Sequence, residues 1–469
     1  MDRSPHYTRD RIEPQAAETP GEQMDRRVFL WTTALAGTAH ALSPATAAAG
    51  GAADGAARAV PPPSQLGPLL NRARATEFMR RAGLDGLVVT APLNVYYLTN
   101  AVPVLSRFSQ VNTTAAVLPA DPGRPIAYVA GGFEYYAGAS DSALAQGVKP
   151  CLVGGKFGQP DSPADPAFDR VGSYAFDARE QHRRALLEGA APFHSGMPEA
   201  LAQALRECGL VRGVVGFDTA DAAALMRQAA PRASLRRAED LLLHVRLVKT
   251  GAELELMRRA SANNVAASLA AARAAREEGS VWRVRQRFFK EAAARGNLGV
   301  YASVDLVMSE LADGPFREGQ SFMIDFVSHY AFYQGDYGRT VFYGEPDKTI
   351  ARATQVGIAA WNEIRSQLRP GVRFSDIRRI GATTVKKLNE PFLYAFNPHS
   401  VGLQHWDQPR TGLAGEPIDL ALEPGMVLSV DCPLLNAGVN GTTHIEDLTL
   451  ITERGSEPIH RVGDETISV

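Results

Sequence analysis

Residues 322–340 have the sequence FMIDFVSHYAFYQGDYGRT, in which two apolar runs each contain one aspartate. If the chain folds back between Tyr330 and Ala331, antiparallel partners have residue numbers that sum to 661, and Asp325 faces Asp336. Directly opposed side chains have Cβ atoms about 4.5–5.5 Å apart on one face of a sheet. An ionised aspartate in an apolar strand is costly unless a positive charge compensates it. The stretch therefore predicts a β-hairpin whose two carboxylates share a cation.

A second pair of acidic residues is predicted nearer the C-terminus. Asp431 precedes a Gly- and Asn-rich turn over residues 436–441, and Glu446 follows that turn. A fold-back between Gly438 and Val439 gives partner sums of 877, which places Asp431 opposite Glu446. The sequence thus predicts two hairpins that each bring two carboxylates together.

Histidines lie between the two hairpins in the sequence. Residues 398–409 read PHSVGLQHWDQP and contain His399 and His405. Four carboxylates and one neutral imidazole that converge would carry about four negative charges without a cation. Oxygen-rich ligation with a single imidazole suits a pair of divalent ions such as Mn, Co or Zn. Two such ions would share a bridging water, lower its pKa and polarise a substrate carbonyl.

The charge balance and the cysteines argue against several classes of protein. The chain has 469 residues, with 49 Lys and Arg against 51 Asp and Glu, so its formal net charge is only -2. A nucleic-acid or membrane-surface partner is therefore not expected. Cys151, Cys208 and Cys432 lie far apart without a C-x-x-C motif, which argues against a disulfide scaffold or a thiolate zinc site. At about 150 residues per domain, the length allows two or three domains.

The first 47 residues have the features of a twin-arginine signal peptide. Arg26 and Arg27 precede a mildly apolar run over residues 31–41, and the small residues Ala45, Thr46 and Ala47 form a cleavage site. The apolar run is too short to cross a bilayer core of about 30 Å. We expect twin-arginine export to the periplasm or the medium, rather than a disordered tail with a chance arginine pair. Residues 48–65 are rich in Gly, Ala and Pro and are expected to form a flexible linker.

Two domains are expected after this linker. Residues 66–242 alternate helices with strands and indicate an α/β domain, with a surface loop over residues 156–171. In residues 243–469, a capping box from Thr250 to Glu253 begins a long helix, and the later strands indicate an α+β domain with an antiparallel sheet. The other expected helices cover residues 69–82, 197–208, 281–294, 350–368 and 374–388. Strands are expected over residues 84–90, 115–118, 126–129, 213–217, 321–328, 332–343, 426–432 and 445–451.

At these residues the chain resembles the pita-bread family, which contains Xaa-Pro aminopeptidases, prolidases, methionine aminopeptidases and the metal-free creatinases. The resemblance runs from about Leu66 to the C-terminus and includes residues 83–87 (GLDGL) and 94–99 (NVYYLT). It implies an α/β creatinase-type N-terminal domain, a C-terminal pita-bread domain and a homodimer. By this resemblance the metal ligands are Asp325, Asp336, His399, Asp431 and Glu446.

The resemblance also implies catalytic roles, and the sequence departs from the family pattern near them. Glu446 or a neighbouring residue is expected to accept the proton of the bridging water. His405 is expected to hydrogen-bond the substrate carbonyl or the tetrahedral oxyanion, although it follows His399 by six residues where the peptidases have seven. His444 replaces an arginine that proline-specific members often carry, so a preference for proline is not predicted.

Two further departures concern the metal ligands and the substrate. Asp431 stands where the family usually has glutamate, and no histidine lies between Leu298 and Asp325, where the peptidases usually have one. Arg339 is expected to pair with a ligand carboxylate and to hold its orientation.

Three functions are compatible with this sequence. The first is an exported metal-dependent hydrolase that cleaves a small peptide or amide. The second is a pita-bread enzyme with other chemistry, a C–N hydrolase or a lyase acting on a small cationic metabolite, which the missing histidine suggests. In that case aromatic rings could face the cation, namely Tyr330, Phe332, Tyr333 and Tyr337. The third is a binding protein that keeps only the fold, against which the retention of every ligand type argues.

Overall fold

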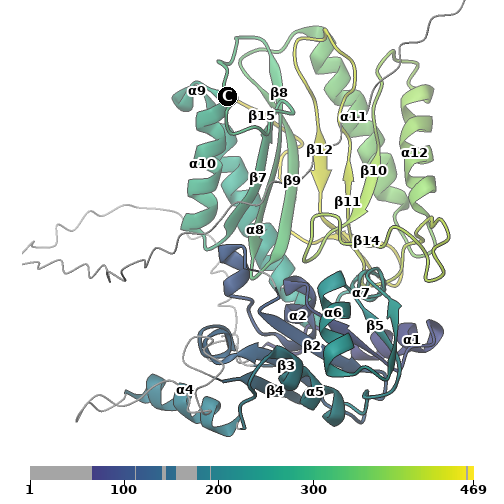
Figure 1. Ribbon diagram of the computed structural model, residues 1–469. Coiled ribbons are helices and arrows are strands. Elements are labelled where there is room, and N and C mark those ends of the chain that lie inside the picture. The colour runs from purple at the N-terminus through teal and green to yellow at the C-terminus, as the bar shows by residue number, and fades with distance from the viewer. Residues whose placement is uncertain (1–65, 111, 140–143, 155–176, 191, 461–462) are drawn as a thin grey trace, which may run out of the picture. The chain divides into compact units, whose positions relative to one another are not determined.

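A computed structural model describes residues 66–469 except 111, 140–143, 155–176, 191 and 461–462 (Figure 1). The expected signal peptide, the expected linker and the expected loop over residues 156–171 lie outside the described residues. Within the described ranges, no helix has the length and apolar character that a bilayer span requires. The three cysteines are all free and buried.

The N-terminal domain is a six-stranded sheet with strand order β4-β3-β2-β1-β5-β6, and a core of buried side chains lies on each face. β1 pairs antiparallel with β2 and parallel with β5, as in an α/β domain with a mixed sheet. Its strands are β1 Gly86–Val89, β2 Thr114–Pro119, β3 Ile126–Gly131, β4 Val148–Val153, β5 Gly213–Phe217 and β6 Ala233–Arg237. Its helices and helical turns are α1 Arg72–Arg81, α2 Pro92–Thr99, η2 Leu105–Phe108, α3 Gly132–Glu134, η3 Tyr135–Ala139, α4 Ala178–Gly189, α5 Met197–Glu207, α6 Ala220–Ala229 and α7 Leu241–Arg246.

The C-terminal domain contains two sheets, each packed against its own helices (Figure 1). One sheet has the order β12-β9-β8-β7, with β15 beside β9, and the other has the order β10-β11-β13-β14. The strands are β7 Leu298–Val304, β8 Ser321–Tyr330, β9 Tyr333–Phe342, β10 Asn397–Ser400, β11 Val427–Asp431, β12 Ile445–Asp447, β13 Thr449–Ile451, β14 Ser456–Pro458 and β15 Thr466–Ser468. The helices are α8 Gly251–Arg273, α9 Ala275–Glu278, α10 Val281–Ala294, α11 Lys348–Gln367 and α12 Phe374–Lys387. The expected fold class is confirmed.

The first acidic hairpin forms, but its predicted register is wrong by two residues. β8 and β9 pair Asp325 with Gly338, so Asp336 lies diagonally from Asp325 and not opposite it. The reversal occurs at Ala331 and Phe332, which both have positive φ (48° and 68°) and form a two-residue turn of the I′ type. Such turns usually contain Asn-Gly, and Ala-Phe carries no such signal. Because a shift of two residues keeps each side chain on its face, both carboxylates still point to the same side.

The predicted second hairpin is also wrong, although two residues whose numbers sum to 877 do pair. β11 pairs with β13, which places Leu428 opposite Thr449, while Glu446 lies in β12 and pairs with Gly338 of β9. The chain therefore changes sheets between Glu446 and Thr449. Arg339 holds this crossing, because its guanidinium donates to the backbone carbonyl of Glu446 at 2.8 Å and to the carboxylate of Asp447 at 2.7 Å.

The capping box predicted at the start of the second domain forms at the N-terminus of α8. Thr250 Oγ1 accepts a hydrogen bond from the backbone N–H of Glu253, and the Glu253 carboxylate accepts one from the backbone N–H of Thr250. The other Glu253 oxygen accepts a hydrogen bond from the Tyr333 hydroxyl at 3.2 Å. Burial raises the pKa of Glu253 to about 7, although nearby Lys249 opposes this shift.

This raised pKa predicts a pH-dependent stability. A carboxyl whose pKa is higher in the folded than in the unfolded chain contributes stability that is complete below about pH 4.5 and is lost as the pH rises to about 7. We expect the unfolding free energy of the wild-type chain, relative to that of Glu253→Gln, to fall by about 3 kcal/mol over this interval. Urea denaturation from pH 4.5 to pH 8 measures it. Glu255→Gln, an exposed position on the same helix, should leave the wild-type slope unchanged.

Candidate metal centre

Three strands of one sheet align two carboxylates on either side of a glycine. Gly338 of β9 pairs with Asp325 of β8 on one side and with Glu446 of β12 on the other. A Cβ atom at Gly338 would collide with the ring of His444 and lie 3.0 Å from Cβ of Glu446. A residue without a side chain is therefore needed here, so that Glu446 and His444 can lie over the middle strand.

The second sheet supplies an imidazole and another carboxylate. On neighbouring strands, His399 of β10 pairs with Ser429 of β11, and Asp431 lies two residues further along β11 on the same face. His399 Nε2 lies 3.7 Å from Asp431 Oδ1 and 3.4 Å from Glu446 Oε1. It also lies 3.8 Å from Oδ2 of Asp336, on β9. The structure thus brings together all five residues that the sequence analysis selected as metal ligands.

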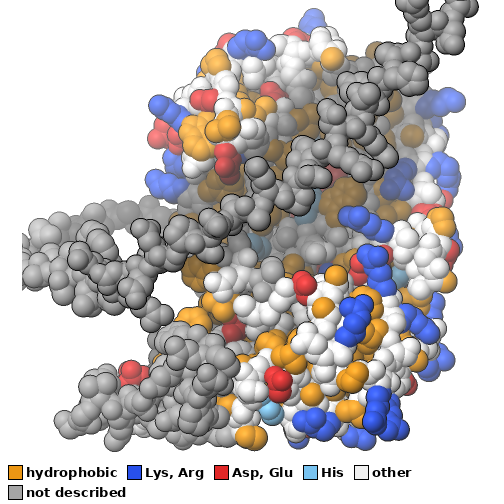
Figure 2. Space-filling view, in the orientation of Figure 1, with side chains coloured by type: hydrophobic (Ala, Val, Ile, Leu, Met, Phe, Trp, Pro, Cys, Tyr) orange, Lys and Arg blue, Asp and Glu red, His pale blue; other side chains and the backbone are white. Residues whose placement is uncertain are grey.

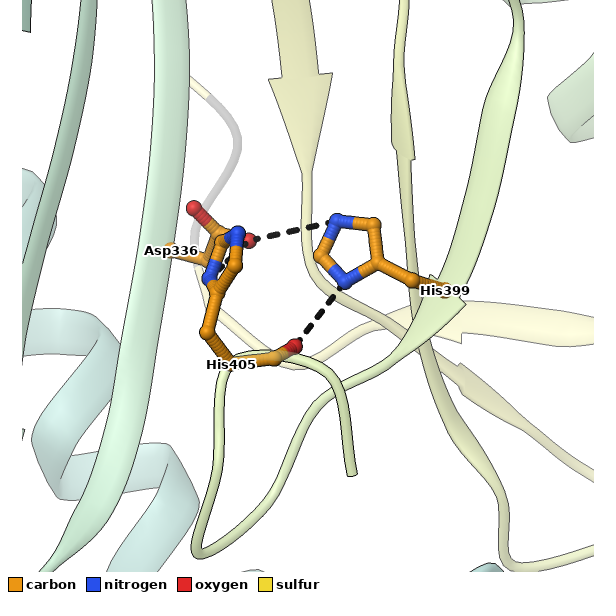
Figure 3. A group of neighbouring side chains, drawn as sticks. All are labelled: Asp336, His399 and His405. Atoms are coloured by element: carbon orange, nitrogen blue, oxygen red, sulfur yellow. Dashed lines mark hydrogen bonds and ion pairs between the residues drawn. The ribbon is translucent and has the colours of Figure 1, made fainter. Parts of the chain in front are cut away.

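Two more histidines lie at the same centre. His405, in the loop after β10, has its Nδ1 atom 3.6 Å from Asp336 Oδ2. His444 Nε2 lies 3.1 Å from Glu446 Oε2. Figure 3 shows Asp336 with the imidazoles of His399 and His405. The donor atoms form two groups, within each of which all atoms lie within 4.8 Å of one another: Asp336, His399 and His405; and Asp325, Asp431, His444 and Glu446.

The donor set fits divalent metal ions. Asp336 and Glu446 are fully buried, yet among the described residues the four carboxylates form hydrogen bonds and ion pairs only with histidine, tyrosine and serine. Both oxygens of Asp336 and Nε2 of His399 lack a hydrogen-bond partner within the described part of the chain. Buried charges without a partner are strongly unfavourable, so convergent acceptors without a cationic side chain indicate a site for a metal ion.

Burial and neighbouring charges shift the pKa values of the side chains at this centre. Burial, followed by the charge of Glu446, raises the pKa of Asp325 to about 7 and that of Asp336 well above its usual range. Burial opposes protonation of His399, but Asp431 and Glu446 raise the pKa of this imidazole well above its usual value. Asp325 and Asp336 therefore bind protons tightly, because the negative charges around them are not fully compensated, and the same condition favours a bound cation.

Tyr301 is a residue of this centre that the sequence analysis missed. Its hydroxyl donates to Asp325 at 3.0 Å and lies 3.3 Å from His405 Nε2. Burial, followed by the charge of Asp325, raises the pKa of this phenol, so the hydroxyl keeps its proton. Tyr301 lies in β7, a strand that was not predicted, and no sequence signal placed it near residues more than a hundred positions away.

Two other expectations about side chains near the centre need revision. Arg339 pairs with Asp447, which is not a predicted ligand, and reaches Glu446 only through its backbone carbonyl. Two of the aromatic rings proposed to face a cationic metabolite instead contact arginines of this chain. Arg259 lies 4.2 Å from the ring of Tyr330, and Arg107 lies 5.1 Å from that of Phe332. Tyr333 and Tyr337 are fully buried.

A cavity of about 420 Å³ adjoins the loop that carries His405. Trp406 contributes to its wall and stacks on His399, with ring centroids 5.6 Å apart. In Figure 2, histidine side chains are visible within a hollow of the displayed face, next to hydrophobic side chains. The cavity is lined by Phe374, Arg378, Trp406, Gln408, Pro409, Arg410, Ile418, Asp419 and Leu420.

Fold and site together define a pita-bread protein with a candidate metal centre between its two sheets. Comparison with protein-family models agrees: residues 224–453 match Metallopeptidase family M24, and residues 72–144 match the Creatinase/Prolidase N-terminal domain. The chain belongs to metallopeptidase family M24.

Individual relatives and solved structures share a quarter or less of their aligned residues with this chain. The chain is 25% identical over 158 residues to an Xaa-Pro dipeptidase of Pyrococcus furiosus, a match that covers 33% of this chain and 44% of that relative. The match to the curated relative thus spans less than half of that protein's length. The fold is similar to that of an Xaa-Pro dipeptidase from Bacillus anthracis, with a TM-score of 0.61, 19% identity and coverage of 85% of this chain and 100% of that chain. A prolidase from Pyrococcus horikoshii gives a TM-score of 0.59, 18% identity and coverage of 84% and 99%.

Proposed function

We propose that this protein is a metal-dependent hydrolase that cleaves the peptide bond of a short peptide. The observation that carries the proposal is the convergence of four carboxylates and three imidazoles from two sheets, with buried donor atoms that lack partners. Family membership and the names of the relatives support a peptide substrate. A pair of divalent ions, when bound there, would act as a Lewis acid and lower the pKa of a water molecule.

The chain's own residues supply proton transfer and substrate binding. Glu446 is held in place because Ser429 donates to its Oε1 at 2.5 Å and His444 lies 3.1 Å from its Oε2. Burial raises its pKa, but the neighbouring imidazoles of His444 and His399 outweigh burial and keep Glu446 ionised, as a proton acceptor requires. His444 Nε2 can in turn exchange a proton with this carboxylate.

The cavity beside Trp406 offers a place for the rest of a peptide. Arg378 and Arg410 are exposed at its wall and can pair with a peptide's carboxylate, while Phe374 and Trp406 provide apolar surface. Its volume of about 420 Å³ suits a ligand of a few residues and not a folded protein. A short peptide with a free carboxylate is therefore the substrate class that we propose.

Metal analysis combined with a peptide panel tests this function. The chain, loaded in turn with Mn, Co and Zn, should retain about two equivalents of divalent ion after desalting and hydrolyse at least one dipeptide or tripeptide. The panel should contain matched peptides with and without proline. Chelation should abolish the hydrolysis, and the same metal should restore it. A chain that keeps no divalent ion and cleaves no peptide would refute the proposal, whereas turnover of an amidine or sulfonium compound alone would favour the C–N hydrolase or lyase.

We also propose that the chain is exported through the twin-arginine pathway. The support is the order of the arginine pair at residues 26–27, the apolar run over residues 31–41 and the small residues 45–47. Cell fractionation with N-terminal sequencing should find the protein outside the cytoplasm, beginning near residue 48. A cytoplasmic protein with an intact N-terminus would contradict export.

A further inference from the structure

The loop that follows β10 turns His405 back onto the carboxylate that His399 also approaches. His405 Nδ1 and His399 Nε2 lie 3.6 and 3.8 Å from the same oxygen, Oδ2 of Asp336. Figure 3 shows both imidazole rings next to this carboxylate. We propose that His405 is itself a metal ligand, so that one metal position has two imidazoles and the Asp336 carboxylate among its donors. This inference rests on the proposed function only in that the centre binds divalent ions.

The distances between donor atoms match ligation of a common ion. Two ligand atoms that each lie about 2.1 Å from a tetrahedral ion are about 3.4 Å apart. The separations of 3.6 and 3.8 Å exceed this value by only a few tenths of an ångström, so small side-chain rotations suffice. A direct hydrogen bond would instead need about 3.2 Å or less. Asp336 Oδ2 is thus too far from either nitrogen for a direct hydrogen bond, and both distances are near the spacing of atoms that surround one ion.

None of these three atoms has a hydrogen-bond partner within the described ranges. They are Oδ2 of Asp336, Nε2 of His399 and Nδ1 of His405. Asp336 and His399 have no exposed surface, and the side chain of His405 is 21% exposed. Because buried polar atoms are almost always paired, three convergent atoms without partners indicate a ligand that they share.

In both histidines, the ring nitrogen that faces away from Asp336 forms a hydrogen bond. The other ring nitrogen therefore directs its lone pair toward Asp336. His399 Nδ1 lies 3.0 Å from the carbonyl oxygen of His405, so it must carry the proton and leave Nε2 free to bind a metal. The Tyr301 hydroxyl donates to Asp325, so it accepts from Nε2–H of His405, which leaves Nδ1 unprotonated. Metal-binding histidines commonly have this arrangement, in which the second ring nitrogen donates to a neighbouring oxygen.

The two halves of the centre then differ in donor chemistry. One group of donor atoms contains two imidazoles, from His399 and His405, and the Asp336 carboxylate, whereas the other contains three carboxylates, from Asp325, Asp431 and Glu446, and one imidazole, from His444. His399 Nε2 also lies 3.4 Å from Glu446 and 3.7 Å from Asp431, so these two carboxylates border both groups. Imidazole-rich sites suit Zn²⁺ or Co²⁺, and carboxylate-rich sites suit Mn²⁺. The centre should therefore bind its first Co²⁺ or Zn²⁺ ion at the half that contains His405.

Titration of the metal-free chain with Co²⁺ tests the role of His405 without relying on activity. Calorimetry gives the affinity of the first equivalent, and X-ray absorption of the singly loaded protein counts its imidazole ligands. We expect two imidazoles in the wild-type chain and one in His405→Ala, with at least a tenfold weaker first equivalent. Tyr301→Phe should weaken the same equivalent about 10- to 100-fold while retaining both imidazoles. His194→Ala, in the N-terminal domain, is the matched control and should bind as the wild type does.

The outcomes separate this inference from the proposed function. Equal affinity and an equal imidazole count in the wild type and His405→Ala would overturn the inference even if the variant lost activity, because His405 would then act on the substrate alone. A wild-type chain that binds no divalent ion would overturn both. If His405→Ala fails to fold, unchanged Co²⁺ affinity in Tyr301→Phe would contradict the orientation on which ligation by His405 depends.

Discussion

Asp336→Asn should lower peptide hydrolysis on the order of a thousandfold and, at the same time, stabilise the metal-free chain. The loss of activity follows because both imidazoles, His399 and His405, converge on this carboxylate, and an amide is a poor ligand in its place. A metal ion supplies several kcal/mol of transition-state stabilisation, and each 1.4 kcal/mol is worth about tenfold in rate.

The opposite effect on stability follows from burial. Asp336 is fully buried, without a hydrogen-bond partner in the described part of the chain, and the charges of Asp325 and Glu446 lie nearby. In the folded chain the raised pKa of Asp336 means that this carboxyl is either ionised beside these charges or protonated at a free-energy cost, whereas a neutral amide avoids both costs. The amide can also donate to an imidazole nitrogen. We expect the metal-free variant to be more stable than the wild type by about 1–3 kcal/mol.

Urea denaturation with a chelator and peptide assays with added metal measure the two effects of Asp336→Asn. Asp221→Asn, at an exposed position on α6, should change neither quantity and serves as the control. Wild-type turnover in Asp336→Asn would remove Asp336 from the site. A less stable metal-free variant would show that this carboxylate has a compensating partner.

The fold class and the ligand set could be predicted because they depend on local patterns. Seven of the eight predicted strands form as single strands, and the eighth, over residues 445–451, is divided between β12 and β13 in different sheets. The carboxylates still reach one centre, although the register of the first hairpin and the pairing of the second are wrong. The first error is harmless because a two-residue shift preserves the face of Asp325 and Asp336. The second is harmless because Glu446 pairs beside Gly338, in the same row as Asp325.

The residues that the sequence did not reveal act through long-range contacts. Tyr301 lies in β7, a strand whose sequence shows no pattern that would predict it. Ser429 alternates with apolar residues in β11, as a serine in any strand can. Arg339 contacts Asp447 because β12 pairs with β9 and not with the sheet that contains β11. This pairing depends on tertiary structure and not on the local sequence. These contacts depend on which strands pair, and local patterns carry no information about that.

A buried ion cluster joins α7 to the loop of His405. Asp407 Oδ1 lies 2.7 Å from Nη2 of Arg246, and Oδ2 lies 3.3 Å from Nζ of Lys249. All three side chains are almost completely buried. Arg246 also donates to Asn94 in the N-terminal domain at 2.7 Å. A Cβ atom at Gly402 would collide with the Asp407 carboxylate, so the loop depends on a glycine to close around this cluster.

Asp407→Asn is expected to destabilise the chain by about 3–5 kcal/mol, because it leaves two buried cations without a counter-charge. Lys249→Met should cost much less, since the pair of Arg246 and Asp407 remains intact. Denaturant unfolding of the metal-free proteins measures both changes. Equal losses in the two variants would contradict this charge assignment.

The same variant also tests whether the ion cluster positions His405. The backbone N–H of Asp407 donates to the carbonyl of Ser400 at 2.8 Å, and its carboxylate accepts a hydrogen bond from the backbone N–H of Leu403, so Asp407 ties together both ends of the loop that contains His405. We therefore expect Asp407→Asn to weaken the first Co²⁺ equivalent at temperatures where the variant is still folded. Lys249→Met, which keeps these loop contacts, should retain wild-type Co²⁺ affinity. If Asp407→Asn loses stability but binds Co²⁺ as the wild type does, then the backbone hydrogen bonds alone determine the position of His405.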